Sequence, residues 1–325
     1  MQARSERRLG RGVPQTIVCA RRSVPSPLVG EGQDGGGRRP PVCRVLASFL
    51  VRNVDPNPRL EALLADLRAR ESILVAYSGG VDSALVAALA FRAVGGRALA
   101  VTAAAETLAG AELDHARAQA AEIGIRHETV TYSELDDPEF VANPSHRCYV
   151  CQGMRMDAML KLAASRGYAT VCDGTNASDP GPDRPGLRAI RERAVYSPLF
   201  EHGIDKATTR ALAQELGLSA WDRPANACLS SRIPHGQLVT LGKLRRIEAA
   251  EQIVAREGFR VVRVRHDADG ARVEVDSDEV ERLARLWPEL EPPLRGLGFS
   301  RVSYDPAGYR RGGADLSRRS ESPAA

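Results

Sequence analysis

The sequence predicts an α/β protein built on a parallel β-sheet, followed by a smaller C-terminal α+β domain. Between positions 58 and 173, short apolar runs alternate with helical segments of roughly 10 to 15 residues, which is typical of βαβ units. After Pro234 the pattern changes to a helix that is followed by short strands around a turn. Hydrophobic residues make up 43% of the 325 residues, which is enough apolar material for a sizeable core.

Hydrophobic spacing predicts the individual elements. Leu60, Leu63, Leu64 and Leu67 recur at helical spacing, which predicts a first helix from about Pro58. The α/β part is expected to contain strands at 72–77, 97–103, 126–132 and 169–173 and helices at 84–94, 110–123 and 154–166. The C-terminal part is expected to contain helices at 241–257 and 278–286, strands at 260–265, 272–275 and 299–304, and a hairpin turn at 267–270.

Composition divides the chain into four parts. Residues 1–52 hold ten arginines but only three acidic residues, and they lack any sustained helical or strand period. We expect a disordered basic extension, which we interpret as non-functional rather than as a transit peptide or a nucleic-acid-binding arm. The expected boundaries are an extension over 1–55, an α/β domain over 56–236, an α+β domain for substrate binding or oligomerisation over 237–309, and a disordered tail over 310–325.

The net charge of +4 is unevenly distributed. The extension carries +7 and the tail +2, so the body of the chain carries −5, which argues against a nucleic-acid partner. No apolar run approaches the roughly 18 to 20 residues of a membrane span. Six cysteines in a chain of this length do not indicate a disulfide scaffold. We therefore expect a cytoplasmic homo-oligomer that binds no membrane.

A glycine-rich loop lies between the first predicted strand and the helix that follows it. Its glycines allow a sharp turn, and the N–H groups of the turn and the helix start favour an anion. Asp82 is better suited to capping the loop or holding Mg²⁺ than to binding phosphate. No Lys-Ser/Thr pair follows at the spacing of a Walker A loop. The candidate phosphate-binding residues are Ser78, Gly79, Gly80, Val81, Asp82 and Ser83.

A second polar group, Asp173, Thr175 and Asn176, follows the strand expected at 169–173. It stands at the carboxyl end of that strand, where ligands bind in open α/β sheets. We therefore expect these side chains to contribute to the nucleotide site.

Three cysteines stand outside the apolar runs. Cys148 and Cys151 form a CxxC motif just before the helix expected at 154–166, and Cys228 lies in a stretch rich in Pro, Asn and Ser. A CxxC motif alone is ambiguous between zinc, redox and cluster chemistry. Three thiolates leave one iron of a [4Fe-4S] cluster without a protein ligand, so that iron is free for sulfide or substrate. Cys172 lies in an apolar strand and is interpreted as a buried small hydrophobe.

These motifs together resemble the LarE-type ATP-dependent sulfur transferases, a branch of the PP-loop ATP pyrophosphatase family. The SGGVDS loop is specific only to the wider family, whereas RPANACLSSRIPHG followed by RVRHD is far more specific. The chain departs from the pattern at Gln152 and His235, where Lys and Tyr are common. The resemblance spans about residues 58 to 313, through SGGVDS (78–83), NPSHRCYVC (143–151), DGTNASD (173–179), DRPGLRA (183–189), RPANACLSSRIPHG (223–236), VRVRHD (262–267) and GFSRVSYDPAGYRRG (298–312).

The resemblance implies a PP-loop domain that uses ATP and Mg²⁺ to adenylylate the carboxylates of pyridinium-3,5-biscarboxylic acid mononucleotide. Sulfur then displaces AMP, which gives the thiocarboxylate precursor of the nickel-pincer nucleotide cofactor. Asp82 and Cys228 are the implied catalytic residues. With Cys148 and Cys151 present, Cys228 is expected to hold a [4Fe-4S] cluster that relays sulfide, and the sulfur donor stays unassigned.

Two points of this interpretation leave room for other arrangements. In family members with one catalytic cysteine, the residue matching Cys228 gives up its own sulfur and becomes dehydroalanine. Arg263 and Arg265 stand two apart on a predicted strand and share one face, so they are expected to bind the phosphate of the mononucleotide. The alternative is that they form a solvated face of that strand.

Three other functions compete with this interpretation. A PP-loop tRNA thiolase would need a basic surface, and the body of this chain is acidic. An amidating ligase that uses ammonia would give the three cysteines no role. A non-catalytic nucleotide-binding protein would not require Asp82 and Ser83 to be intact.

Overall fold

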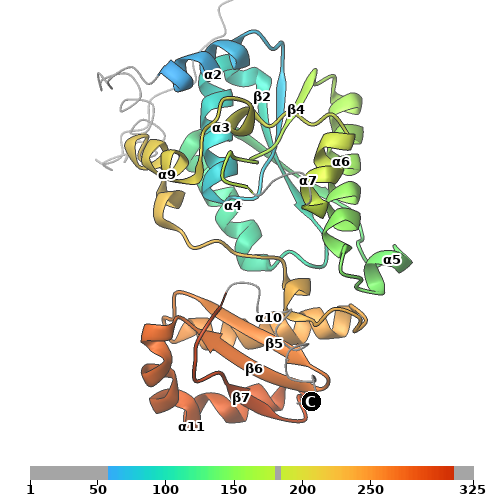
Figure 1. The fold of residues 1–325 in the computed structure, drawn as a ribbon, viewed down its shortest axis with the longest axis vertical. Coiled ribbons are helices and arrows are strands. Elements are labelled where there is room, and N and C mark those ends of the chain that lie inside the picture. The colour runs from blue at the N-terminus through green and yellow to red at the C-terminus, as the bar shows by residue number, and fades with distance from the viewer. Residues whose placement is uncertain (1–57, 180–183, 311–325) are drawn as a thin grey trace, which may run out of the picture. The chain divides into compact units, whose positions relative to one another are not determined.

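The computed structural model describes residues 58–179 and 184–310 (Figure 1). The basic extension expected over 1–55 and nearly all of the tail expected over 310–325 lie outside these residues. Within them, the expected α/β class with a smaller C-terminal sheet is confirmed.

The larger sheet contains four parallel strands in the order β3-β2-β1-β4. They are β1 (Ile73–Ala76), β2 (Ala98–Ala104), β3 (Arg126–Thr131) and β4 (Thr170–Cys172). β1 lies in the centre, because Ile73 pairs with Ala98 of β2 on one side and with Thr170 of β4 on the other. The strand order reverses between β1 and β4, and such a switch point is where open α/β sheets bind ligands.

Helices cover both faces of this sheet (Figure 1). Alternate strand residues serve the two faces: Ile73 and Val75 pack into one hydrophobic cluster and Leu74 into the other. The first cluster contains side chains of α2 (Pro58–Arg68), α3 (Val81–Val94), α4 (Gly110–Ile123) and α9 (Lys206–Glu215). The second contains side chains of α6 (Arg147–Arg166) and α7 (Pro185–Glu192).

Several short helices were not predicted, because they begin with proline or with a capping aspartate. Such residues also favour turns, so sequence pattern alone did not separate the two. These helices are α5 (Pro138–Val141), α7, α8 (Pro198–Glu201) and α9, and the 3₁₀ turns η1 (Gly95–Arg97), η2 (Ser219–Asp222) and η3 (Leu229–Arg232) were also not expected.

Helix α6 begins at Arg147, seven residues before its expected start at Met154. The prediction that the CxxC motif precedes this helix is therefore wrong, and Cys148 and Cys151 lie in its first turns. Buried Val150 and Cys151 continue the apolar stripe of the helix towards its N-terminus. The polar residues around them concealed this continuation.

The smaller sheet has the order β5-β6-β7. β5 (Val262–Asp267) and β6 (Gly270–Val275) form the expected antiparallel hairpin, and β7 (Val302–Tyr304) adds to β6 in parallel. The helices of this part are α10 (Leu241–Arg256) and α11 (Val280–Gly296), which follows the turn η4 (Ser277–Glu279).

Helix α11 continues ten residues past its expected end at Leu286. It contains Pro288, Pro292 and Pro293, each of which lacks the N–H of a regular helical bond. Leu290 and Leu294 are buried in the C-terminal core, so burial of apolar surface offsets the missing bonds.

No helix in residues 58–179 and 184–310 combines the length and the apolar character needed to cross a membrane.

We predict that His266 of β5 makes stability fall in mild acid. Its ring is fully buried against Phe299, and neither ring nitrogen has a hydrogen-bond partner among the described residues. Burial, together with Arg246 and Lys243, lowers the pKa of His266 from 6.5 to about 4. Between these values the unfolded chain takes up a proton that the folded chain does not. The contribution of His266 to the free energy of unfolding is therefore fully present above about pH 6.5, and about 3 kcal/mol of it is lost as the pH approaches 4.

Urea unfolding of His266→Phe, measured from about pH 7 down to about pH 4.5, should show a shallower loss of stability than the native chain. His146→Gln is the matched control, because the His146 side chain is half exposed and lies at the surface beside Glu139. Equal slopes for His266→Phe and the native chain would contradict this assignment.

Candidate functional site

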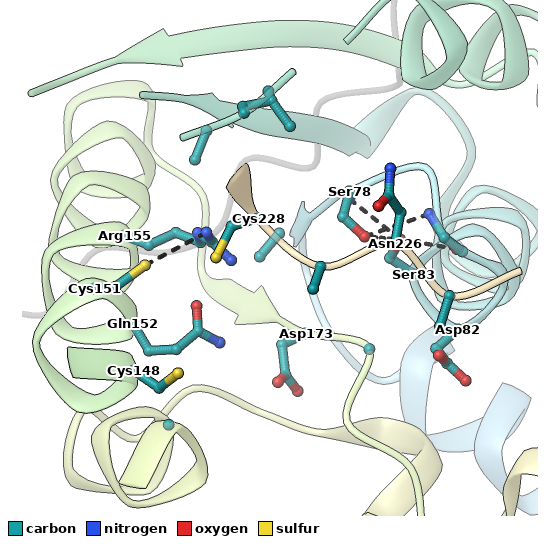
Figure 2. A pocket seen from close by; sticks show the side chains of 18 of the residues that line it. Ser78, Asp82, Ser83, Cys148, Cys151, Gln152, Arg155, Asp173, Asn226 and Cys228 are labelled. Carbon is teal, nitrogen blue, oxygen red and sulfur yellow. Dashed lines mark hydrogen bonds between the residues drawn. The ribbon is translucent and has the colours of Figure 1, made fainter. Parts of the chain in front are cut away.

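A cavity of roughly 770 Å³ opens at the carboxyl ends of β1, β2 and β4 (Figure 2). Ser78 follows β1 and Asp173 follows β4, so the two polar groups expected from the sequence meet at the switch point. Cys148, Cys151 and Cys228 also line this cavity. The fold therefore brings the three cysteines and most residues of the two predicted polar loops to one cavity, whereas Gly79 and Asn176 are not among its lining residues.

The glycine-rich loop lies between β1 and α3, as the sequence predicts. Gly79 has φ +73°, and a Cβ there would meet Ala116 at 3.0 Å, so only glycine fits. The Ser83 hydroxyl accepts from the Ser78 N–H at 3.2 Å and donates to the Gly80 carbonyl at 3.1 Å. Helix α3 starts without a side-chain cap, which leaves its N-terminal N–H groups available to an anion.

Asp82 does not cap the loop, although the sequence left that role open. Its carboxylate accepts from Asn176 Nδ2 at 3.0 Å and forms an ion pair with Lys206 of α9. Lys206 and Arg210 also line the cavity. Cationic side chains and a helix N-terminus at one end of the cavity suit a polyphosphate.

Asp173 is buried behind the loop, with 6% of its surface exposed. Burial raises the pKa of Asp173, while hydrogen bonds from Ser197, at 2.6 Å, and from Thr175 oppose that rise. Gly174, which stands between Asp173 and Thr175 in the sequence, packs on the start of α3. The approach is so close that a Cβ at Gly174 would lie 2.8 Å from the Ser83 nitrogen. Asp173, Thr175 and Asn176 are thereby held against the glycine-rich loop.

Cys148 and Cys151 stand three residues apart in the first turns of α6 and so lie on neighbouring positions of the helix. Figure 2 shows both side chains on one wall of the cavity and Cys228 on the segment that crosses it. Cys148 is exposed, Cys151 is buried and Cys228 is half-buried.

Cys151 and Cys228 each have polar neighbours. Cys151 Sγ donates to Glu134 Oε1 at 2.9 Å and accepts from Arg155 at 3.6 Å. Burial raises the pKa of the Cys151 thiol well above its usual value, and Glu134 adds to this rise. Cys228 Sγ lies 3.1 Å from Ser230 Oγ.

The donor set suits iron and sulfide, because three thiols share one cavity. Across residues 58–179 and 184–310, however, no three His, Cys, Asp or Glu side chains stand close enough together to hold a metal ion. The structure thus brings the three cysteines to one cavity without arranging them around a common centre.

Arg263 and Arg265 lie side by side on β5, and both guanidinium groups approach the ring of Tyr309. Both are buried, at 6% and 8% exposure, and neither is among the described residues that line the cavity. Arg265 pairs with Glu274 at 2.9 Å. Their expected contact with a substrate phosphate stays a prediction.

Some cavity residues were not identified from the sequence. Glu112 at the start of α4 accepts from Nη1 and Nη2 of Arg223 at 2.9 and 2.8 Å and from Asn226 at 2.7 Å. Glu112 carries no local motif, although Arg223 and Asn226 stand in the stretch around Cys228. Lys206, which lines the cavity, and buried Glu134, which bonds to the cavity residue Cys151, likewise gain their roles only from contacts with residues distant in sequence.

A parallel sheet with SGGVDS at its switch point, facing an Asp-Gly-Thr-Asn turn, defines a PP-loop enzyme that uses ATP. Consistent with this class, a family model described as asparagine synthase matches residues 60–159.

Comparison with known proteins then narrows the class to a family. The chain is 35% identical to the pyridinium-3,5-bisthiocarboxylic acid mononucleotide synthase of Lactiplantibacillus plantarum over 251 residues, which cover 77% of this chain and 91% of the relative. It is 41% identical to the uncharacterized protein slr1717 of Synechocystis sp. over 259 residues, covering 78% and 97%. The chain belongs to the LarE-type family of ATP-dependent sulfur transferases.

A more distant similarity connects the chain with enzymes of tRNA thiolation. It is 29% identical to the tRNA-specific 2-thiouridylase MnmA of Rhizobium johnstonii over 204 residues, half of each chain.

We predict that Gly174→Ala weakens ATP binding by about tenfold, because the new methyl group displaces Ser83 and the N-terminus of α3. Isothermal titration with an ATP analogue measures the affinity. Gly242→Ala in α10 is the matched control, since a Cβ at Gly242 meets no atom within 4 Å. Unchanged affinity in a folded Gly174→Ala variant would show that this close approach does not shape the phosphate site.

Proposed function

We propose that the enzyme adenylylates the carboxylates of pyridinium-3,5-biscarboxylic acid mononucleotide with ATP and then replaces oxygen by sulfur. The observation that carries this proposal is that the glycine-rich loop and three cysteines open into one cavity. An amidating ligase would leave the cysteines without a role, and a purely nucleotide-binding protein would not need them.

In the first step a substrate carboxylate oxygen attacks the α-phosphorus of ATP. The bond from that phosphorus to the bridging oxygen breaks, and pyrophosphate leaves. The N–H groups at the start of α3, with Lys206 and Arg210, are positioned to receive the negative charge of the leaving group. Asp82 and Asp179, which both line the cavity and both accept a hydrogen bond from Asn176, would hold Mg²⁺, which would supply further charge neutralisation.

In the second step sulfur attacks the acyl carbon and AMP leaves with the electron pair of the C–O bond. We propose that Cys148, Cys151 and Cys228 would hold a [4Fe-4S] cluster, which would serve as a source of sulfide. Support comes from the shared cavity and from the neighbouring positions of Cys148 and Cys151 on α6. The second candidate is sacrificial use of Cys228, which its half-buried place in the cavity wall favours.

The cluster proposal predicts iron and sulfide in protein purified without oxygen, with a loss of most iron in Cys148→Ala, Cys151→Ala and Cys228→Ala. Cys172→Ala is the control, because Cys172 lies fully buried in β4, away from the cavity lining. Colorimetric iron and sulfide analysis measures the content. Iron-free native protein that shows dehydroalanine at position 228 after turnover would support the sacrificial route instead.

The proposed function is tested by supplying ATP, Mg²⁺, a sulfide source and the pyridinium mononucleotide. Pyrophosphate release and a product in which oxygen is replaced by sulfur, both seen by mass spectrometry, are the expected result. A parallel reaction with tRNA in place of the mononucleotide distinguishes the proposed function from that of a tRNA thiolase. Thiolation of tRNA, or pyrophosphate release without thiocarboxylate, would overturn the substrate assignment.

A further inference from the structure

The segment 223–232, which carries Cys228, contains only the short turn η3 as regular structure. Its backbone carbonyls therefore need partners other than a helix or a sheet. The half-buried Arg210 donates to the Arg223 carbonyl at 3.0 Å, and four buried arginines, here called the arginine cradle, donate to carbonyls further along the segment. Arg147 donates to Ser230 at 3.0 Å, Arg232 to Ala227 at 2.6 Å and Cys228 at 3.0 Å, Arg263 to Ala225 at 3.0 Å, and Arg265 to Ser231 at 3.0 Å.

All four side chains of the arginine cradle are buried, with exposures between 1% and 8%. Buried guanidinium groups require counter-charges and a full set of acceptors. Arg232 pairs with Glu251 of α10 at 2.8 Å, and Arg265 pairs with Glu274 of β6 at 2.9 Å. The carbonyls of the Cys228 segment are the further acceptors.

The arginine cradle reaches the segment from separate elements of the fold. Arg147 comes from the first turn of α6, which also carries Cys148 and Cys151, while Arg263 and Arg265 come from β5. The carbonyls turn towards the arginines, and Asn226, Ala227 and Cys228 line the cavity. The hydrogen bonds from Arg263 and Arg265 of β5 thus connect the smaller sheet to the backbone that orients the Cys228 side chain.

We propose that Arg263 and Arg265 are positioning residues that fix the Cys228 segment, rather than ligands of a substrate phosphate. This inference rests on the proposed role of Cys228 in sulfur transfer. It also gives a physical reason for arginine, rather than lysine, at position 265. Its planar group binds Glu274 through Nε and the Ser231 carbonyl through Nη1 at the same time, and a lysine ammonium cannot reproduce that fork.

The test is the alkylation rate of Cys228 by iodoacetamide in metal-free, substrate-free protein, with peptide mass spectrometry to resolve the individual cysteines. Loss of one charged hydrogen bond to the segment should raise the rate in Arg265→Lys by about tenfold. Arg272→Lys is the matched control. Arg272 pairs with the same Glu274 at 3.3 Å, stands opposite Arg265 in the hairpin and is 43% exposed.

A kinetic comparison separates positioning from phosphate binding. For Arg265→Lys we expect kcat to fall by about tenfold while the preference for the mononucleotide over its phosphate-free nucleoside stays as in the native enzyme. A collapse of that preference with unchanged alkylation would overturn the proposal. If the native enzyme turns over neither compound, the proposed substrate is wrong, while the alkylation result still decides the positioning role.

Folding is checked by thermal melting of both variants. If Arg265→Lys does not fold, Arg263→Lys replaces it, because Arg263 makes the equivalent bond to the Ala225 carbonyl. An alkylation rate in the folded variant that equals the rate in Arg272→Lys would contradict the proposal.

Discussion

Parallel pairing of β1 with both β2 and β4 is the constraint on which the site depends. Because the strands run in one direction, their carboxyl ends meet, and the chain must leave β1 and β4 on the same side of the sheet. The departing segments then lie in contact, so close that Gly174 admits no side chain beside Ser83. Asp82, Asn176 and Lys206 close a polar network across this junction. A phosphate site and its surrounding charges follow from the sheet order.

The opposite wall of the cavity depends on arginine rather than on strand pairing. The Cys228 segment is irregular, so guanidinium groups, together with the bond from the Leu229 N–H to the Thr107 carbonyl at 2.9 Å, hold its backbone. This arrangement connects the Cys228 segment both to α6 and to the smaller sheet. It also explains why the side chains of Arg263 and Arg265 are buried, because a contact with a substrate phosphate at the surface would not require their burial.

Features encoded by neighbouring residues were predictable, and features that join distant residues were not. The loop at 78–83 follows from a strand, two glycines and a helix in direct succession. The seven described strands followed equally well, whereas the helices α5, α7, α8 and α9 were not expected. By contrast, Lys206 reaches Asp82 across 124 residues, and Glu112 reaches Arg223 across 111. Helix α11 passes three prolines because its leucines are buried, and burial is a property of the fold rather than of local propensity.

We propose that one cavity activates the substrate with ATP and delivers sulfur to it. An experimental structure with Mg²⁺ and a non-hydrolysable ATP analogue would decide this. We expect the β- and γ-phosphates on the N–H groups of residues 79–83, next to Lys206, with the α-phosphorus facing the wall that carries Cys228. A nucleotide bound outside this cavity, or one whose α-phosphorus points away from Cys228, would contradict it.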